Sequence, residues 1–196
     1  LADPESDASQ KHDFLVALTE KGESPGEISA FAASFRGLAI DPSVAAFRDA
    51  AIDVCGTGGD KSGSFNLSTT TAMILATAGV PVFKHGNRSI TSGCGSADLL
   101  ERLGVPLQGV DGDHVRALEN LNFTFFFAPA FHPAFKEIMP VRQALGAEGI
   151  RTIFNLLGPL INPGRPAHQL LGVFSLEFVE PVAAALHELG LRRGLV

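Results

Sequence analysis

A glycine-rich stretch at residues 56–71, GTGGDKSGSFNLSTTT, combines four glycines, one acid and a run of hydroxyl side chains. It follows the apolar AAIDVC and precedes a helical pattern, an order in which backbone N–H groups and a helix N-terminus can bind an anion such as pyrophosphate. The glycine offsets match neither the Walker A motif nor the dinucleotide fingerprint. Asp60 and Ser68 add the hard oxygen groups that Mg²⁺ and a ribose need. The alternative is a merely tight strand-to-helix connection.

A second polar stretch, KHGNRS at residues 84–89, follows the next predicted strand. Parallel strands open at the same edge of a sheet, so Lys84, His85, Asn87 and Arg88 would lie near the same anion. Two alternatives stay open. The stretch can be an ordinary solvated loop, and His85 can be a hydrogen-bonding residue rather than an acid or base near neutral pH.

Three further features lie in or after an aromatic strand, FTFFFAP. The phenylalanines of the strand itself favour a core position, because a central strand is buried on both faces. Phe131, His132 and Phe135 come after it and are candidates for a pocket wall. Arg142 could bind a carboxylate through two hydrogen bonds or form a surface salt bridge.

The pattern along the chain predicts the elements that position these residues. Two helices are expected over 12–22 and 24–39, and Ser24, Pro25 and Glu27 form an N-cap with a capping box. Strands are expected over 50–55, 80–86, 122–129 and 168–175, helices over 68–79, 95–104 and 176–190, and a Gly-Pro turn within 150–160. The terminal GLV would begin another strand. The alternation predicts an α/β fold, a mostly parallel central sheet with flanking helices, plus a small helical N-terminal part.

Composition limits the function classes. The chain has 196 residues, 45% of them hydrophobic, enough for a sizeable core. A formal net charge of −6 argues against non-specific binding of nucleic acid. Cys55 and Cys94 fit neither a disulfide framework nor a zinc site, so we expect buried free thiols. No apolar stretch is long enough for a membrane helix and the first residues are acidic, so we expect a cytoplasmic protein. Both ends suggest a fragment.

Several motifs in order resemble the anthranilate phosphoribosyltransferase family: DVCGTGGD, FNLST, KHGNRS, GSADLLERLG, FAPAFHPAF and RTIFNLLGPLINPGRP. The resemblance runs from about KGESPGEI to the last residue. It implies a helical N-terminal domain, of which residues 1–50 are a remnant with its linker, and an α/β domain over 51–196 that lacks its C-terminal part. It also implies a homodimer, Mg²⁺ as cofactor, and transfer of the phosphoribosyl group of phosphoribosyl pyrophosphate (PRPP) to the amino nitrogen of anthranilate, in tryptophan biosynthesis.

The resemblance also implies roles for individual residues. Ser68 would bind Mg²⁺, and anthranilate would contact Gly56, His85, Asn87 and Arg142, with Lys84, Asn87 and Arg142 positioning the substrates. PRPP would be held by the residues of the glycine loop and of the segment after the second strand: Gly56, Gly59, Asp60, Ser64, Asn66, Leu67, Ser68, Thr69, Lys84, Asn87, Arg88, Ser89, Ser92 and Ser96.

Three departures from the family pattern matter. The first helices of the family are largely absent, the Asp-Glu pair that binds Mg²⁺ would lie beyond Val196, and LGAEGIRT is longer than the usual link after Arg142. Without those carboxylates we expect weak metal binding and little catalysis. The alternatives are an enzyme like pyrimidine nucleoside phosphorylase, which shares the fold, and a non-catalytic relative that binds nucleic acid, against which the charge argues.

Overall fold

The computed structural model describes residues 1–58, 65–88, 94–107, 109 and 111–196. Five of the predicted site residues lie outside the described residues: Gly59, Asp60, Ser64, Ser89 and Ser92.

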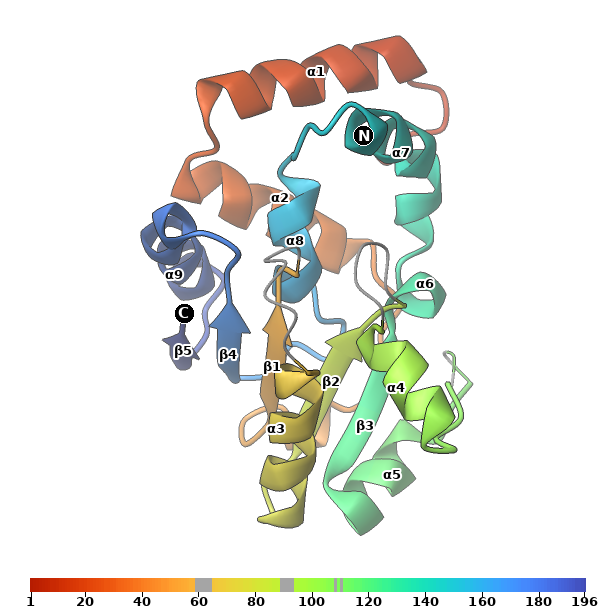
Figure 1. Cartoon of the computed structure of the whole chain (residues 1–196). Coiled ribbons are helices and arrows are strands. Elements are labelled where there is room, and N and C mark those ends of the chain that lie inside the picture. The colour runs from red at the N-terminus through yellow and green to blue at the C-terminus, as the bar shows by residue number, and fades with distance from the viewer. Residues whose placement is uncertain (59–64, 89–93, 108, 110) are drawn as a thin grey trace.

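A parallel sheet of five strands carries the fold, in the order β3-β2-β1-β4-β5 (Figure 1). The strands are Ile52–Gly56 (β1), Val82–Gly86 (β2), Phe123–Phe127 (β3), His168–Gly172 (β4) and Arg193–Leu195 (β5). Each pair of neighbours is parallel. The predicted α/β class and each predicted strand are therefore confirmed, including the one that the terminal GLV begins.

The boundaries between neighbouring strands, called seams below, are not equivalent in their pairing. β1 pairs with β4 over five residues, and β2 pairs with β3 over five, but the register between β1 and β2 is the single pair Ile52 and Val82. Figure 1 shows β1 and β2 diverging toward their carboxyl ends. The sheet thus consists of two well-paired halves that meet along a short seam.

Helices cover both faces of the sheet, because alternate strand residues point to opposite sides. Val54 and Val82 pack against Ala72 and Ala76 of α3 (Leu67–Thr77), and Phe125 packs against α4 (Ser96–Arg102). The strand residues that alternate with these point to the other face of the sheet. Three helices cover that face: α5 (His114–Leu121), α8 (Phe154–Leu160) and α9 (Val179–Glu188).

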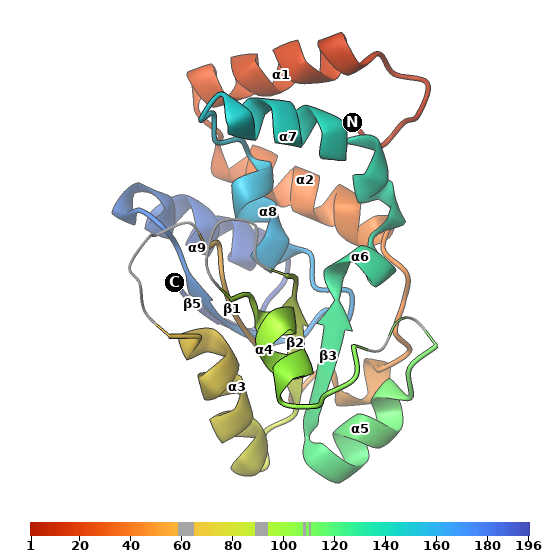
Figure 2. The same cartoon turned by 45° about the vertical axis from the view of Figure 1, so that its right-hand side comes forward.

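A second layer of helices lies beyond the carboxyl edge of the sheet (Figure 2). It contains α1 (Ala8–Lys21), α2 (Pro25–Gly37) and α7 (Met139–Ala147). The predicted capping box of α2 is confirmed, since Glu27 N–H donates to Ser24 Oγ at 3.3 Å and Ser24 N–H donates to the Glu27 carboxylate at 2.9 Å. These helices share one buried cluster with α8 and α9, so the prediction of a boundary at residue 50 stays a prediction.

Short segments connect these elements: η1 (Ala45–Phe47), α6 (Ala128–Phe131), η2 (Pro133–Glu137) and η3 (Leu176–Phe178). The sequence patterns predicted none of α5, α6 and α7. The Gly-Pro turn expected within 150–160 is wrong, because Gly158 and Pro159 lie inside α8. Proline at this position removes one helical hydrogen bond, the one from residue 159 to the Asn155 carbonyl.

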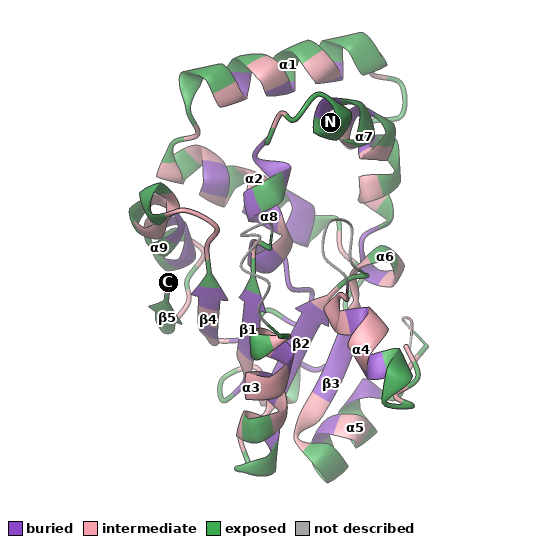
Figure 3. Cartoon of the chain, viewed as in Figure 1, coloured by how far each residue is buried: buried purple, intermediate pink, exposed green. Residues whose placement is uncertain are grey.

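Burial follows the same plan, with β1, β2 and α8 largely enclosed (Figure 3). Phe125 and Phe126 of the aromatic strand are buried, as predicted, on opposite faces of the sheet, and Phe131 joins the cluster of Phe126 instead of lining a pocket. Cys55 is a buried free thiol, whereas Cys94 is free but only half-buried. Among the described residues, no helix is both long and apolar enough to cross a membrane.

Candidate functional site

The candidate site lies at the carboxyl edge of the sheet, where the chain changes direction. Strands β1, β2 and β3 follow one another toward one side, and β4 and β5 extend the sheet to the other, so β1 and β4 flank the switch point. Ligands of open α/β sheets bind outside the strand ends at such a point. The glycine loop leaves β1 here and the KHGNRS segment leaves β2 beside it (Figure 1).

Glycine at the start of the loop allows a close backbone approach to β4. Thr57 N–H donates to the Gly172 carbonyl at 2.9 Å, and a Cβ on Gly56 would lie 3.3 Å from that same oxygen. Gly58 has a φ of +67°, which favours glycine. The first turn of the loop is therefore fixed to the end of β4.

The N-terminus of α3 has features that suit an anion. Its N-cap, Asn66, makes no side-chain capping bond within the described residues, and the first turn has no acidic residue. The first N–H groups of a helix and the positive end of its dipole favour an anion. Ser68 is half-buried here, while the Thr69 side chain is buried. Asn66 Nδ2 also lies 3.6 Å from Cys94 Sγ, which brings the start of α3 next to the approach to α4.

Lys84 supplies a buried positive charge in β2, the strand next to β1. It is 3% exposed, and its Nζ donates to the His85 carbonyl at 3.1 Å. None of the ion pairs recorded among the described residues includes it. The charge of Lys84 acts on the buried Asp53 carboxyl group, and an anionic ligand would stabilise the buried ammonium group further.

The segment after β2 is held against α4. The Asn87 carbonyl accepts hydrogen bonds from Ala97 N–H at 3.2 Å and from the Ser96 hydroxyl at 3.3 Å. A Cβ on Gly86 would lie 2.1 Å from Ser96 Oγ, so only glycine allows this approach. The Ser96 hydroxyl is thus directed to the protein backbone.

Arg88 is engaged with acidic side chains of α4. Its guanidinium donates to both Glu101 carboxylate oxygens, at 2.7 Å from Nη2 to Oε1, and lies 3.4 Å from Asp98. These contacts raise the pKa of Arg88, first through Glu101. Its predicted role in PRPP binding stays a prediction and would require these ion pairs to be exchanged.

His85 and His132 form a buried pair between the sheet and the second layer. Their Nε2 atoms lie 3.2 Å apart, and His85 Nδ1 lies 3.2 Å from the Gly158 carbonyl. Because a carbonyl only accepts, His85 carries its hydrogen on Nδ1, and His132 donates from Nε2. Burial lowers the pKa of His85 well below its usual value and that of His132 to about 4. Both rings are neutral at pH 7, so His85 is a positioning group rather than a cation.

Arg142 ends a row of rings that begins at this pair. The His132 ring lies 5.7 Å from that of Phe135, and the Arg142 guanidinium lies 5.7 Å from the Phe135 ring and 5.1 Å from that of Phe154. Its one recorded hydrogen bond among the described residues is to Met139 Sδ at 3.8 Å. Desolvation by burial lowers its pKa. A half-buried guanidinium between aromatic faces suits the carboxylate of an aromatic acid.

Sequence reasoning missed two residues below the site, Asp53 and Asn162. Asp53 is fully buried in β1 and accepts hydrogen bonds from Asn162 Nδ2 at 2.9 Å and from His85 N–H at 3.3 Å. The available signal was an acid inside the apolar run AAIDVC, which a buried strand does not normally contain.

The described residues do not form a complete metal site. No group of three or more histidine, cysteine, aspartate or glutamate side chains within them could hold a metal ion. Ser68, the predicted Mg²⁺ ligand, offers a single hydroxyl. Mg²⁺ prefers several oxygen ligands, so further ligands would come from phosphate oxygens of a substrate, from water or from groups outside the described residues.

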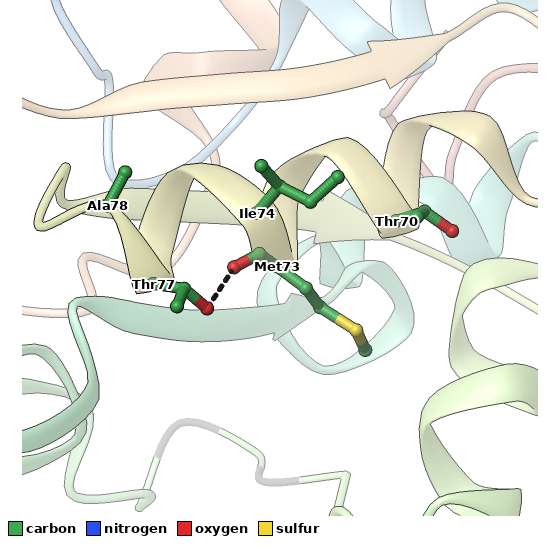
Figure 4. A pocket seen from close by; sticks show the side chains of 5 residues that line it. All are labelled: Thr70, Met73, Ile74, Thr77 and Ala78. Atoms are coloured by element: carbon green, nitrogen blue, oxygen red, sulfur yellow. Dashed lines mark hydrogen bonds between the residues drawn. The ribbon is translucent and has the colours of Figure 1, made fainter.

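Two surface hollows lie away from this edge. One runs along the outer face of α3, between Thr70 and Ala78 (Figure 4), and the other lies on α5. The α3 hollow is lined by Thr70, Met73, Ile74, Thr77 and Ala78, none of them ionisable, so it offers no acid, base or charge for chemistry.

Comparison with known proteins points to one group. Residues 48–196 match the model of the glycosyl transferase family, a/b domain. The chain is 48% identical over 183 residues to the anthranilate phosphoribosyltransferase of Desulfitobacterium hafniense (strain Y51), an alignment that covers 93% of this chain and 53% of that protein. The chain thus spans about half the length of the curated relatives it matches.

Solved structures agree. The anthranilate phosphoribosyltransferase of Thermus thermophilus superimposes with a TM-score of 0.89 at 46% identity, over 96% of this chain and 56% of that one. The enzyme of Saccharomyces cerevisiae, solved in complex with PRPP and Mg, gives a TM-score of 0.77 at 28% identity, over 95% of this chain and 52% of that one.

Proposed function

Because the chain belongs to the glycosyl transferase family whose a/b domain its residues 48–196 match, we propose that it transfers the phosphoribosyl group of PRPP to the amino nitrogen of anthranilate. The observation that carries the proposal is the placement of two cations, Lys84 and Arg142, on either side of the His85–His132 pair, neither of them in an ion pair recorded among the described residues. One suits the pyrophosphate of PRPP and the other the carboxylate of an aromatic amine.

The proposed reaction needs little acid or base chemistry. The amino nitrogen forms a bond to C1 of the ribose, the bond from C1 to the pyrophosphate oxygen breaks, and the nitrogen loses a proton. An arylamine is already unprotonated near pH 7. The protein's contribution is therefore to hold both substrates in line and to stabilise the charge on the leaving pyrophosphate.

The described residues divide this work between two places. The glycine loop from Gly56, the first turn of α3 at Asn66–Thr69 and Lys84 would hold the pyrophosphate and ribose of PRPP. Arg142 would bind the anthranilate carboxylate, with His85 and Asn87 beside the amine. Magnesium, when bound, would neutralise pyrophosphate charge, with Ser68 as one ligand, in line with the yeast relative solved with PRPP and Mg.

The test is an assay of anthranilate consumption. The protein its gene encodes should lower anthranilate fluorescence only when PRPP and Mg²⁺ are both present. Ser68→Ala should weaken the use of Mg²⁺ and PRPP more than anthranilate affinity, and Arg142→Ala the reverse. Fluorescence that stays constant with PRPP and Mg²⁺ present would refute the activity, and phosphate-dependent release of a base from a pyrimidine nucleoside would favour a phosphorylase instead.

A homodimer and a cytoplasmic location belong to the same proposal. Both are expected of a biosynthetic enzyme of this kind, and the described residues contain no helix suited to a membrane. Light scattering of the purified protein tests the first. A mass equal to one chain at micromolar concentration would contradict it.

A further inference from the structure

The seam between β1 and β2 is completed by side chains. Ile52 N–H donates to the Pro81 carbonyl at 2.9 Å, which sets the phase of a parallel ladder. Continued by two residues, that ladder would join Val54 to the Phe83 carbonyl and to His85 N–H. The recorded register stops at Ile52 and Val82.

Asp53 and Asn162 occupy the two β2 groups that Val54 would have bonded. His85 N–H donates to Asp53 Oδ1 at 3.3 Å, and Asn162 Nδ2 donates to the Phe83 carbonyl at 2.7 Å. Asn162 Nδ2 also donates to Asp53 Oδ2 at 2.9 Å, and Asn162 Oδ1 accepts from Gly164 N–H at 2.9 Å. One carboxylate and one amide thus satisfy the two backbone groups of β2 that a peptide of the neighbouring strand satisfies in a regular ladder.

The surroundings are consistent with a carboxylate at this position. Asp53 and Asn162 are 0% and 1% exposed, so a broken hydrogen bond here would not be replaced by water. Burial raises the pKa of Asp53, while the charge of Lys84 and the donors at Asn162, His85 and Cys55 oppose that shift. A buried carboxyl group with these donors has its lone pairs satisfied.

We infer that Asp53, together with Asn162, is a positioning element that sets the distance between the two halves of the active site. The half formed by β1 and β4 carries the glycine loop and α3, and the half formed by β2 and β3 carries Lys84, His85 and Asn87. Within each half, the two strands are paired over five residues. The boundary between β1 and β2 therefore sets the position of one half relative to the other. The inference about catalysis rests on the proposed function, whereas the inference about the seam does not.

Hydrogen exchange in the protein labelled with ¹⁵N tests the seam without any substrate. The His85 amide of the unaltered protein should exchange slowly, although no strand carbonyl accepts it. Asp53→Asn has nearly the same size but places an NH₂ group against either His85 N–H or Asn162 Nδ2. His85 protection should fall about tenfold, equivalent to 1.4 kcal/mol, while Leu170, whose N–H faces β1 in the β1–β4 ladder, keeps its protection.

Two results would overturn the inference about the seam. One is rapid exchange of the His85 amide in the unaltered protein, which needs no variant that folds. The other is an Asp53→Asn protein in which His85 and Leu170 lose protection equally, or neither does. The double change Asp53→Asn with Asn162→Asp restores a donor and an acceptor between the two positions and should regain part of the His85 protection.

Kinetics test the consequence for the reaction. Because each half-site stays intact, Asp53→Asn should lower kcat per folded molecule about a hundredfold and leave both KM values within about threefold. Gln169→Leu is the matched control, since Gln169 lies opposite Asp53 on β4, is 4% exposed and donates to Pro159 O at 2.6 Å. An equal fall in kcat for both variants would overturn the positioning role. No turnover in the unaltered protein would refute the proposed function and leave the exchange result standing.

Discussion

The two seams that flank β1 are built in different ways. Toward β4, the strand has a five-residue register, and each of the two strands ends in a glycine, Gly56 in β1 and Gly172 in β4. A Cβ on Gly56 would lie 3.3 Å from the Gly172 carbonyl oxygen. Toward β2, it has one paired residue and then the side chains of Asp53 and Asn162. A backbone ladder tolerates many side chains, whereas a seam made of side chains depends on the identity of each. The second seam is therefore where single substitutions should act most strongly.

The largest expected difference comes from removing one buried amide at each seam. Asn162→Leu leaves the Asp53 carboxylate, the Phe83 carbonyl and Gly164 N–H without their partner, and should lower the free energy of unfolding by about 3–5 kcal/mol. Gln169→Leu at the β4 side removes a donor to Pro159 O and should lower it by about 1–2 kcal/mol. Urea unfolding measures both, and equal losses would remove the distinction.

Glycines at the strand ends give the next largest effect. Gly86→Ala, on the β2 side, places a Cβ 2.1 Å from Ser96 Oγ and 3.0 Å from the Phe125 ring, and should cost about 1–3 kcal/mol of unfolding free energy. Gly172→Ala, on the β4 side, meets nothing within 4 Å and should change it by less than about 0.5 kcal/mol. Thermal unfolding of the two variants checks the contrast, and a larger shift for Gly172→Ala would reverse it.

Acid should weaken the β2 side through its histidine pair. The folded-state pKa of His132, about 4, lies below the unfolded value, so the unfolded chain binds more protons between pH 6.5 and 4 and stability falls as pH falls through that range. His132→Gln should reduce the loss of unfolding free energy between pH 7 and pH 5 by about 1–2 kcal/mol. His187→Gln, an exposed position on α9, is the control. Identical pH dependence in all three proteins would contradict the assignment.

The smallest effect is expected from the exposed ion pairs of α4. Arg88→Ala removes contacts to Glu101 and Asp98 and should lower the free energy of unfolding only slightly, because exposed pairs are screened by solvent. Fluorescence-monitored unfolding in 0.1 M and 1 M salt measures it. A PRPP affinity in Arg88→Ala that falls more than tenfold would show that Arg88 leaves α4 to bind the substrate.

The sequence predicted the strands well because each is a short apolar run ended by glycine or polar residues, and it predicted the capping box because Ser24 and Glu27 have the required spacing. It placed Lys84 and His85 at the correct edge for the same reason. It could not predict Asp53 and Asn162 as partners, because 109 positions separate them and no local pattern reports a long-range contact. The prediction of a Gly-Pro turn within 150–160 was wrong for a related reason, since tertiary packing of Leu157 and Leu160 outweighs a local turn signal.

The packing of α2 has a consequence for synthesis of the chain. Its apolar residues Ile28 and Phe35 are buried in a cluster with Val182 and Leu186 of α9, more than 140 positions further on. At about 5–20 residues per second, a ribosome takes roughly seven to thirty seconds to reach α9 after making α2. Through that interval the α2 surface has no α9 to cover it, so nascent chains stalled before α9 should be the form that chaperones retain.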